Sequence, residues 1–116
     1  MKLRSLTIAL AALLAIGGAQ AQLVTLVEAI ELSPDNMILP GSQNGMVSFR
    51  PCAGECEEEH RRARLTADTR FYVEGRAVDF PDFLNSYASI RLSRDGYALI
   101  SVKTKTRTVE SIRIQG

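Results

Sequence analysis

Residues 94–102 read RDGYALISV and carry the clearest indication of fold class in this chain. The first three residues predict a tight turn, because an Asp-Gly pair is a strong hairpin signal. The residues that follow are apolar on both faces of an extended chain, with Ile100 and Val102 on one face and Tyr97 and Leu99 on the other. Strands of this kind are covered on both faces. We therefore expect a central or buried strand here.

Short strand-like runs separated by turns occupy much of the remaining chain. These runs are residues 23–32, 37–39, 46–50, 62–66, 69–74, 89–93 and 109–114. One segment changes to the period of a helix, since Phe80, Phe83, Leu84 and Tyr87 stand at i, i+3, i+4 and i+7. Asp79 is placed to cap this short helix. Together the patterns predict a mainly β fold, a small antiparallel barrel of six or seven strands with one short helix.

Two of these regions carry a resemblance to a known kind of domain. Residues 69–78, TRFYVEGRAV, contain a Thr-x-Phe-x-Val strand and a Gly turn, and residues 111–114, SIRI, form a last strand with alternating Ile. This order resembles small exported bacterial domains of unknown function that are built as OB-like β-barrels. The resemblance covers about residues 23–114 and implies an OB-like barrel, which binds through an open face and neighbouring loops. It assigns no catalytic or binding residue, and residues 52–60 are not part of the pattern.

The first 21 residues predict a cleaved signal peptide. Lys2 and Arg4 form a basic start, residues 6–19 are apolar, and Ala19-Gln20-Ala21 places small residues where a signal peptidase reads them. The apolar run is too short to span a bilayer, which needs about 20 residues. We expect one domain at residues 22–116, exported to the periplasm or, as the alternative, secreted. No transmembrane segment is expected in the mature chain.

Composition and missing motifs argue against two classes of function. Without residues 1–21 the chain holds 12 basic and 13 acidic residues, a net charge of −1. A general nucleic-acid binder is strongly basic, so no nucleic-acid partner is expected. The chain has one His and lacks the nucleophile elbow, the Walker loop, the zinc-protease helix and the dinucleotide fingerprint. We predict no catalytic residue, and an enzyme is unsupported.

The two cysteines, Cys52 and Cys56, predict a disulfide, because an exported chain meets an oxidising compartment. Pro51 and Gly54 favour the turn that this short loop requires. The alternative is a zinc or copper site, since Cys52, Cys56 and His60 would share one face of a helix. Pro51 and Gly54 disfavour that helix, so our first interpretation includes no cofactor.

Two charged segments are candidate binding surfaces. The first is the acidic loop of Glu55, Glu57, Glu58 and Glu59, which could dock a basic partner or simply pair with the arginines that follow. The second is a basic stripe, because an extended chain would place Lys103, Lys105 and Arg107 on one face. The stripe could bind an anion, and its bland alternative is a solvated hairpin end or a protected edge strand.

Our first functional hypothesis is a non-enzymatic periplasmic binding or interaction module with a disulfide-stapled acidic loop. Its partner would be an unknown protein or a small anionic ligand. One alternative is a metal- or redox-responsive protein that uses Cys52, Cys56 and His60. The other is an anionic-ligand binder that uses the basic stripe near the C-terminus.

Overall fold

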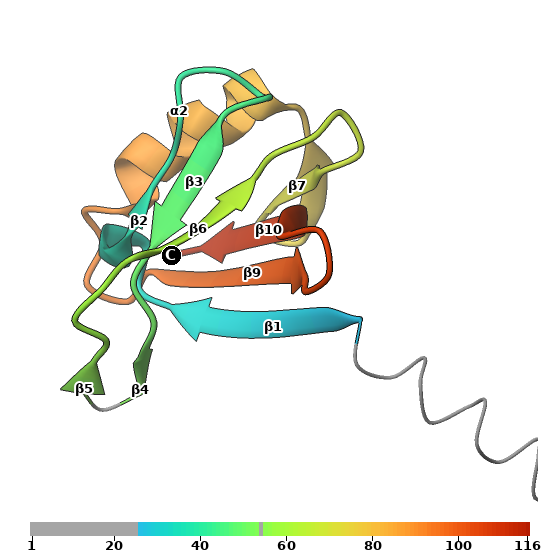
Figure 1. Ribbon diagram of the computed structural model, residues 1–116. Coiled ribbons are helices and arrows are strands. Elements are labelled where there is room, and N and C mark those ends of the chain that lie inside the picture. Colours follow the sequence, from blue (N-terminus) through green and yellow to red (C-terminus); the bar gives the residue numbers. More distant parts are fainter. Residues whose placement is uncertain (1–25, 54) are drawn as a thin grey trace, which may run out of the picture.

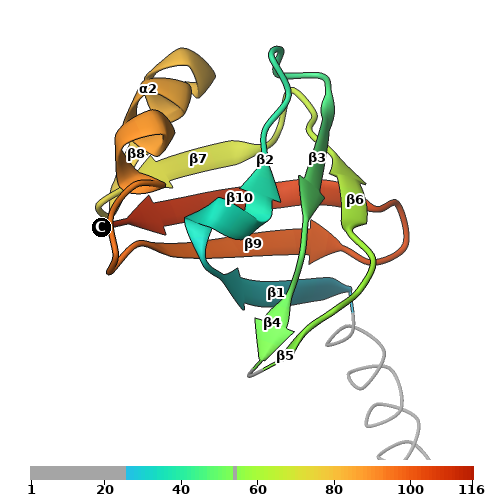
Figure 2. The same ribbon diagram turned by 90° about the vertical axis from the view of Figure 1, so that its left-hand side faces the viewer.

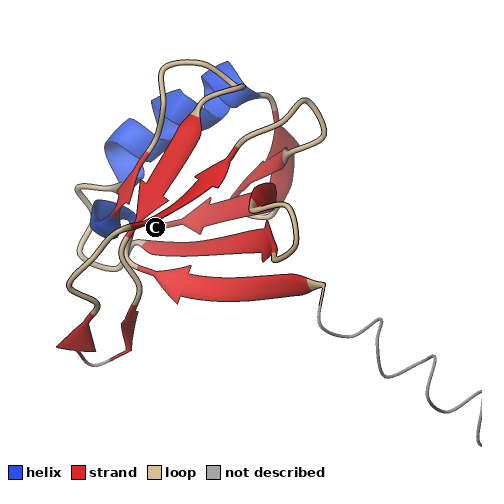
Figure 3. Ribbon diagram, viewed as in Figure 1, coloured by secondary structure: helices blue, strands red, loops and turns tan. Residues whose placement is uncertain are grey.

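The computed structural model describes residues 26–53 and 55–116, so the predicted signal peptide at residues 1–21 lies outside the described part. The strands are β1 (Val27–Leu32), β2 (Met37–Ile38), β3 (Met46–Phe49), β4 (Cys52–Ala53), β5 (Glu55–Cys56), β6 (Arg61–Arg64), β7 (Arg70–Val73), β8 (Arg76–Val78), β9 (Tyr97–Lys103) and β10 (Thr108–Gln115). The helices are the 3-10 turn η1 (Pro34–Asn36) and α2 (Phe80–Ile90). Strands dominate, and the predicted mainly β fold with one short α-helix is confirmed (Figure 3).

Eight strands form one sheet in the order β1-β9-β10-β6-β3-β2, with β7 also paired to β10 and β8 paired to β7 (Figure 1). Strand β9 pairs with β1 on one side and β10 on the other, which places the doubly apolar run at the centre as expected. Its neighbours are antiparallel, whereas β10 runs parallel to both β6 and β7. The sheet is therefore mixed and not purely antiparallel.

The sheet curls but does not close into a barrel. In Figure 2, strands β2, β3 and β6 cross in front of β10, β9 and β1, so the two halves face each other. Among the described strands, β1 pairs only with β9 and β2 only with β3, which leaves two ends of the strand order unjoined. The sheet therefore stays open, and the candidate binding site lies between β1 and the facing strands β3 and β6.

Helix α2 covers one end of the curled sheet with the apolar stripe that its sequence predicted. Phe83 is fully buried and lies 4.9 Å from Phe71 of β7, measured between ring centroids. Asp79 caps the helix, since its Oδ1 accepts a hydrogen bond from the Asp82 amide at 2.9 Å. The Tyr87 hydroxyl is within hydrogen-bonding reach of the carbonyl oxygens of Pro34 and Met37, which ties the helix to the η1–β2 segment.

The strand expected at residues 89–93 is wrong. The helix continues to Ile90, and Leu92 beyond it is 81% exposed. Ile90 stands three residues after Tyr87, so it extends the helical stripe as well as it fits a two-residue alternation. The helix is favoured over the strand because it packs one continuous apolar face on the sheet. No helix in the described ranges is long and apolar enough to cross a bilayer.

Candidate binding site

The two cysteines lie directly opposite each other on the two short strands of a hairpin. Cys52 of β4 is paired with Cys56 of β5, and their sulfurs are bonded at 2.01 Å. The hairpin projects from the body of the sheet beside β1 (Figures 1 and 2). His60 lies outside the hairpin, just before β6. Cys52, Cys56 and His60 therefore share no helical face. Among the described residues, no cluster of His, Cys, Asp or Glu side chains could hold a metal ion.

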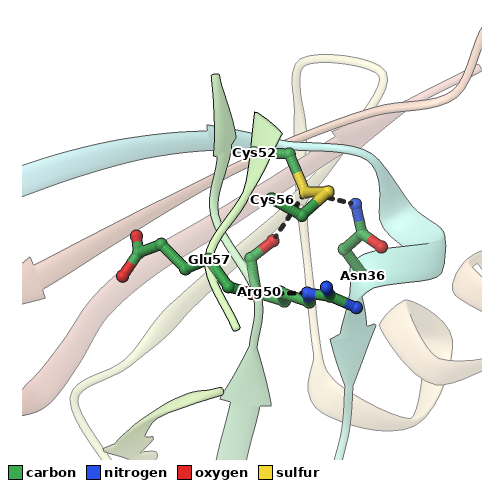
Figure 4. Close-up of a disulfide and its surroundings, with 5 residues drawn as sticks. All are labelled: Asn36, Arg50, Cys52, Cys56 and Glu57. Atoms are coloured by element: carbon green, nitrogen blue, oxygen red, sulfur yellow. Dashed lines mark hydrogen bonds between the residues drawn. A yellow bond between two sulfur atoms is a disulfide. The ribbon is translucent and has the colours of Figure 1, made fainter. Parts of the chain in front are cut away.

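Backbone-directed hydrogen bonds fasten the hairpin to the sheet (Figure 4). Arg50 Nε donates to the Glu57 carbonyl at 2.6 Å, and the Arg50 amide donates to the Asn36 carbonyl at 2.8 Å. Asn36 Nδ2 also points at the disulfide, 3.3 Å from Cys52 Sγ. The Glu57 carboxylate points away from the sulfurs and is free to reach β6. The disulfide loop is thus held at its base, with its acidic side chains displayed outward.

A groove of about 600 Å³ lies on the open side of the sheet between β1 and β6. We call it the cationic groove, because its rim carries His60, Arg61, Arg62 and Arg107 against the single carboxylate of Glu28. Its floor is apolar and consists of three core side chains, Ile30, Phe49 and Val102. An apolar floor below a charged rim is the usual make-up of a small-ligand site.

Arg61 links the rim of this groove to the disulfide hairpin. Its Nη1 lies 3.4 Å from Glu28 Oε1, and its Nη2 lies 3.0 Å from Glu57 Oε2. The hydrogen bond to Glu57 raises the pKa of Arg61 above its ordinary value, and Glu28 adds to the effect while desolvation opposes it. Both carboxylates thus neutralise this guanidinium. Arg62 and Arg107 form no ion pair with the described residues, and they supply the free positive charge of the rim.

A second groove, of about 460 Å³, runs between β1 and the hairpin. We call it the acidic groove, because four carboxylates line it, those of Glu28, Glu31, Glu55 and Glu57. The only base among its lining residues is Arg61, which is already paired twice. Two grooves of opposite charge therefore meet at one arginine.

The predicted acidic loop is divided by the structure. Glu55 and Glu57 line the acidic groove, whereas Glu58 and Glu59 are exposed and line neither groove. The loop was expected to pair with the arginines that follow it, and Glu57 does pair with Arg61. Glu28, 33 residues before Arg61, joins this pair without any signal from local spacing. One signal could have found Glu28, since it interrupts the inward-facing apolar side of β1.

The predicted basic stripe does not exist as one face. Residues 104–107 form the turn between β9 and β10, and Arg107 adopts a positive φ of 53°. Arg107 therefore lines the cationic groove, while Lys103 lies with Arg70 and Arg113 in a depression on the other face of the sheet. Lys105 sits exposed in the turn and lines neither groove. A tight turn breaks the two-residue alternation on which the stripe depended.

Neither a protein-family model, a curated protein nor a solved structure matches this chain significantly.

Proposed function

We propose that this protein is an exported, non-enzymatic binding module that holds an anionic ligand with an apolar portion in its cationic groove. The observation that carries the proposal is the lining of the groove, in which two arginines without an ion pair, Arg62 and Arg107, accompany the apolar floor. Arginine presents a planar fork of donors that matches a carboxylate or a phosphate. The floor would shield the ligand's hydrocarbon part from water, which contributes about 25 cal/mol per Å² of apolar area.

Two features support placement in the periplasm. The first 21 residues have the composition of a signal peptide. The Cys52–Cys56 disulfide suits an oxidising compartment, where such bonds persist. Mass measurement of the exported protein tests this part, because an intact Met1 would contradict cleavage.

We propose a non-enzymatic role because the sequence contains few side chains that could act in catalysis. Its single histidine, His60, is exposed at the groove rim, and the catalytic motifs named above are missing from the sequence. The arginines of the groove bind and orient anions, and they are too basic to exchange protons near neutral pH. Binding without turnover is the activity that these groups support.

Calorimetric titration with decanoate tests the proposal, with decanol as the probe that lacks the charge and inorganic phosphate as the probe that lacks the hydrocarbon chain. We expect decanoate to bind, and both other probes to bind at least about tenfold more weakly, since each loses one kind of contact. Failure of decanoate to bind at millimolar concentration would overturn the proposal.

Matched variants locate the site. Arg62→Ala and Arg107→Asn should each weaken decanoate binding by about tenfold, the size of one charge-assisted hydrogen bond. Asn is used at residue 107 because it tolerates the positive φ there. Lys105→Asn removes an equal charge from the same turn as Arg107 and should change affinity by less than about twofold. Equal losses in all three variants would show general charge attraction and would rule out a groove site.

A further inference from the structure

We propose that the outer edge of β1 binds an extended, lysine-rich segment of a partner protein, which adds to the sheet as one more strand. Among the described strands, β1 pairs only with β9, so its other edge is open. This binding surface lies in the acidic groove, which shares Glu28, Ile30 and Arg61 with the cationic groove but does not include Arg62 or Arg107. The two proposals can therefore fail independently.

The hydrogen-bond alternation of an antiparallel pair identifies the free backbone groups. The Thr104 amide donates to the Leu26 carbonyl at 3.0 Å, so Leu26 and Thr104 form a hydrogen-bonded pair. Bonded and non-bonded pairs alternate along such a ladder. Glu28 and Ile30 consequently bond to β9, while the N–H and C=O groups of the odd-numbered residues point away from it. Those residues are Val27, Ala29 and Glu31.

Room for a strand exists beside this edge. The acidic groove of about 460 Å³ runs between β1 residues 28–31 and the hairpin residues Pro51, Cys52, Glu55 and Glu57. Strand β1 is six residues long, so its edge extends about 20 Å at about 3.4 Å per residue. A short extended peptide would fit along it, with the disulfide hairpin as the outer wall.

Charge decides which occupant suits this edge. The lining side chains hold four carboxylates and one guanidinium, a net charge of −3. A second copy of the chain would bring its own Glu28 and Glu31 against these groups, and such like-charge contacts oppose pairing of edge strands. A cationic strand forms opposite-charge cross-strand pairs instead.

The two faces of β1 define the side-chain pattern of the partner. Glu28 lies on the face that meets Arg61 and Glu57, whereas Val27, Ala29 and Glu31 are exposed on the opposite face. An added strand with alternating Lys and apolar residues would place the cations toward Glu28 and the hairpin carboxylates. Its apolar side chains would lie beside Val27, which is 43% exposed.

Amide hydrogen exchange with a blocked Val-Lys-Val-Lys-Val-Lys hexapeptide tests the proposal on the complete protein. The amides of Val27, Ala29 and Glu31 should gain about tenfold protection when the peptide is present at ten times its Kd. Those of Glu28 and Ile30, which already bond to β9, should change little. A Glu/Val peptide of the same length should not bind.

Three further changes, one in the peptide and two in the protein, separate strand addition from simple charge attraction. N-methylation of the peptide amides that face β1 keeps every charge but should weaken binding by at least about tenfold, because those hydrogen bonds are lost. Ala29→Pro removes one outward N–H at an edge position where proline is tolerated, and should weaken binding likewise, with Ala29→Val as its control. Glu55→Gln removes one groove charge at a residue outside the sheet and should weaken binding severalfold.

Three results would overturn the proposal. These are no binding of the Lys/Val peptide at millimolar concentration, equal binding of the N-methylated peptide, and protection of the same three amides that rises with protein concentration without peptide. The last result would identify a second copy of the chain as the occupant. Loss of decanoate binding in an Arg62→Ala variant leaves this test unaffected, because Arg62 does not line the acidic groove.

Discussion

Arg61 Nη1 lies 3.4 Å from Glu28 Oε1 and so joins β6 to β1 across the open side of the sheet. No backbone pairing connects these two strands. The same guanidinium is hydrogen-bonded to Glu57 at the base of the disulfide hairpin. One side chain therefore stands at the boundary of both grooves, and its two partners set how much positive charge the cationic groove presents.

Glu28→Gln should strengthen anion binding with little effect on stability. Loss of the carboxylate leaves Arg61 held by Glu57 alone and adds one positive charge to the groove, so the Kd for decanoate should fall about two- to fivefold. The Glu28 and Arg61 side chains are about half exposed, at 53% and 43%, so the free energy of unfolding should change by less than about 1 kcal/mol. Calorimetry and urea titration measure the two quantities.

Glu31→Gln is the matched control for that experiment. It removes the same charge from the same strand, but Glu31 lines only the acidic groove. Its effect on decanoate affinity should be smaller than that of Glu28→Gln. Equal effects in the two variants would mean that overall charge, and not the position of Arg61, controls binding.

The Cys52→Ser and Cys56→Ser double variant should remain folded but lose stability. A disulfide that closes a five-residue loop is expected to contribute about 2 kcal/mol through the unfolded state. For a domain of this size the melting temperature should fall by about 10 °C. The hairpin contributes no residue to the buried apolar core of the described chain, so the far-UV circular dichroism spectrum should be unchanged. Thermal melts with and without reductant check this, and wild type in reductant should match the variant.

Most elements could be predicted from the sequence because the spacing of their apolar side chains matches the repeat of the strand or helix that they form. The run at Tyr97–Lys103 proved central, and the stripe from Phe80 to Tyr87 proved helical. The two-residue alternation gave wrong predictions where another backbone conformation fits the same residues. Ile90 satisfied both a strand and a helix, and Arg107 lies in a turn that alternation cannot reveal.

Strand pairing and the grooves could not be predicted, because they depend on contacts between distant segments. Ile112 of β10 lies beside Phe71 of β7 in parallel register, and no local pattern encodes that neighbour. Arg61 meets Glu28 only because the sheet curls. The charged residues of both grooves can be read from the sequence. They are brought together only because the sheet curls.

Phe83→Ala should be among the most damaging single substitutions in this chain. Phe83 is 0% exposed and contacts Phe71, so its removal leaves a cavity between α2 and β7. Substitutions of this kind cost about 3–5 kcal/mol. Leu92→Ala is the control, because Leu92 is 81% exposed and should change the free energy of unfolding by less than about 0.5 kcal/mol. Urea titration distinguishes them, and similar values for both variants would place α2 outside the cooperative core.

Tyr87→Phe tests the link between α2 and the η1–β2 segment. The Tyr87 hydroxyl is near the carbonyl oxygens of Pro34 and Met37, and Pro34 and Met37 are buried. Removing the hydroxyl takes a donor from both oxygens, although the Pro34 carbonyl keeps the Met37 amide as a donor. The loss should cost about 1–3 kcal/mol at pH 8. Urea titrations of the two proteins measure the difference.

The same pair of proteins should show a pH dependence whose sign follows from burial. Desolvation raises the pKa of Tyr87 above its ordinary value, Asp35 adds to the shift and Arg91 opposes it. Because the folded state prefers the neutral phenol, the stability from Tyr87 is fully present below the unfolded pKa of about 10 and is lost as the pH rises above it. The advantage of the wild type over Tyr87→Phe should therefore shrink as the pH rises above about 10. The other tyrosines titrate in both proteins and cancel in the difference, so a constant difference across this range would contradict the buried hydrogen bond.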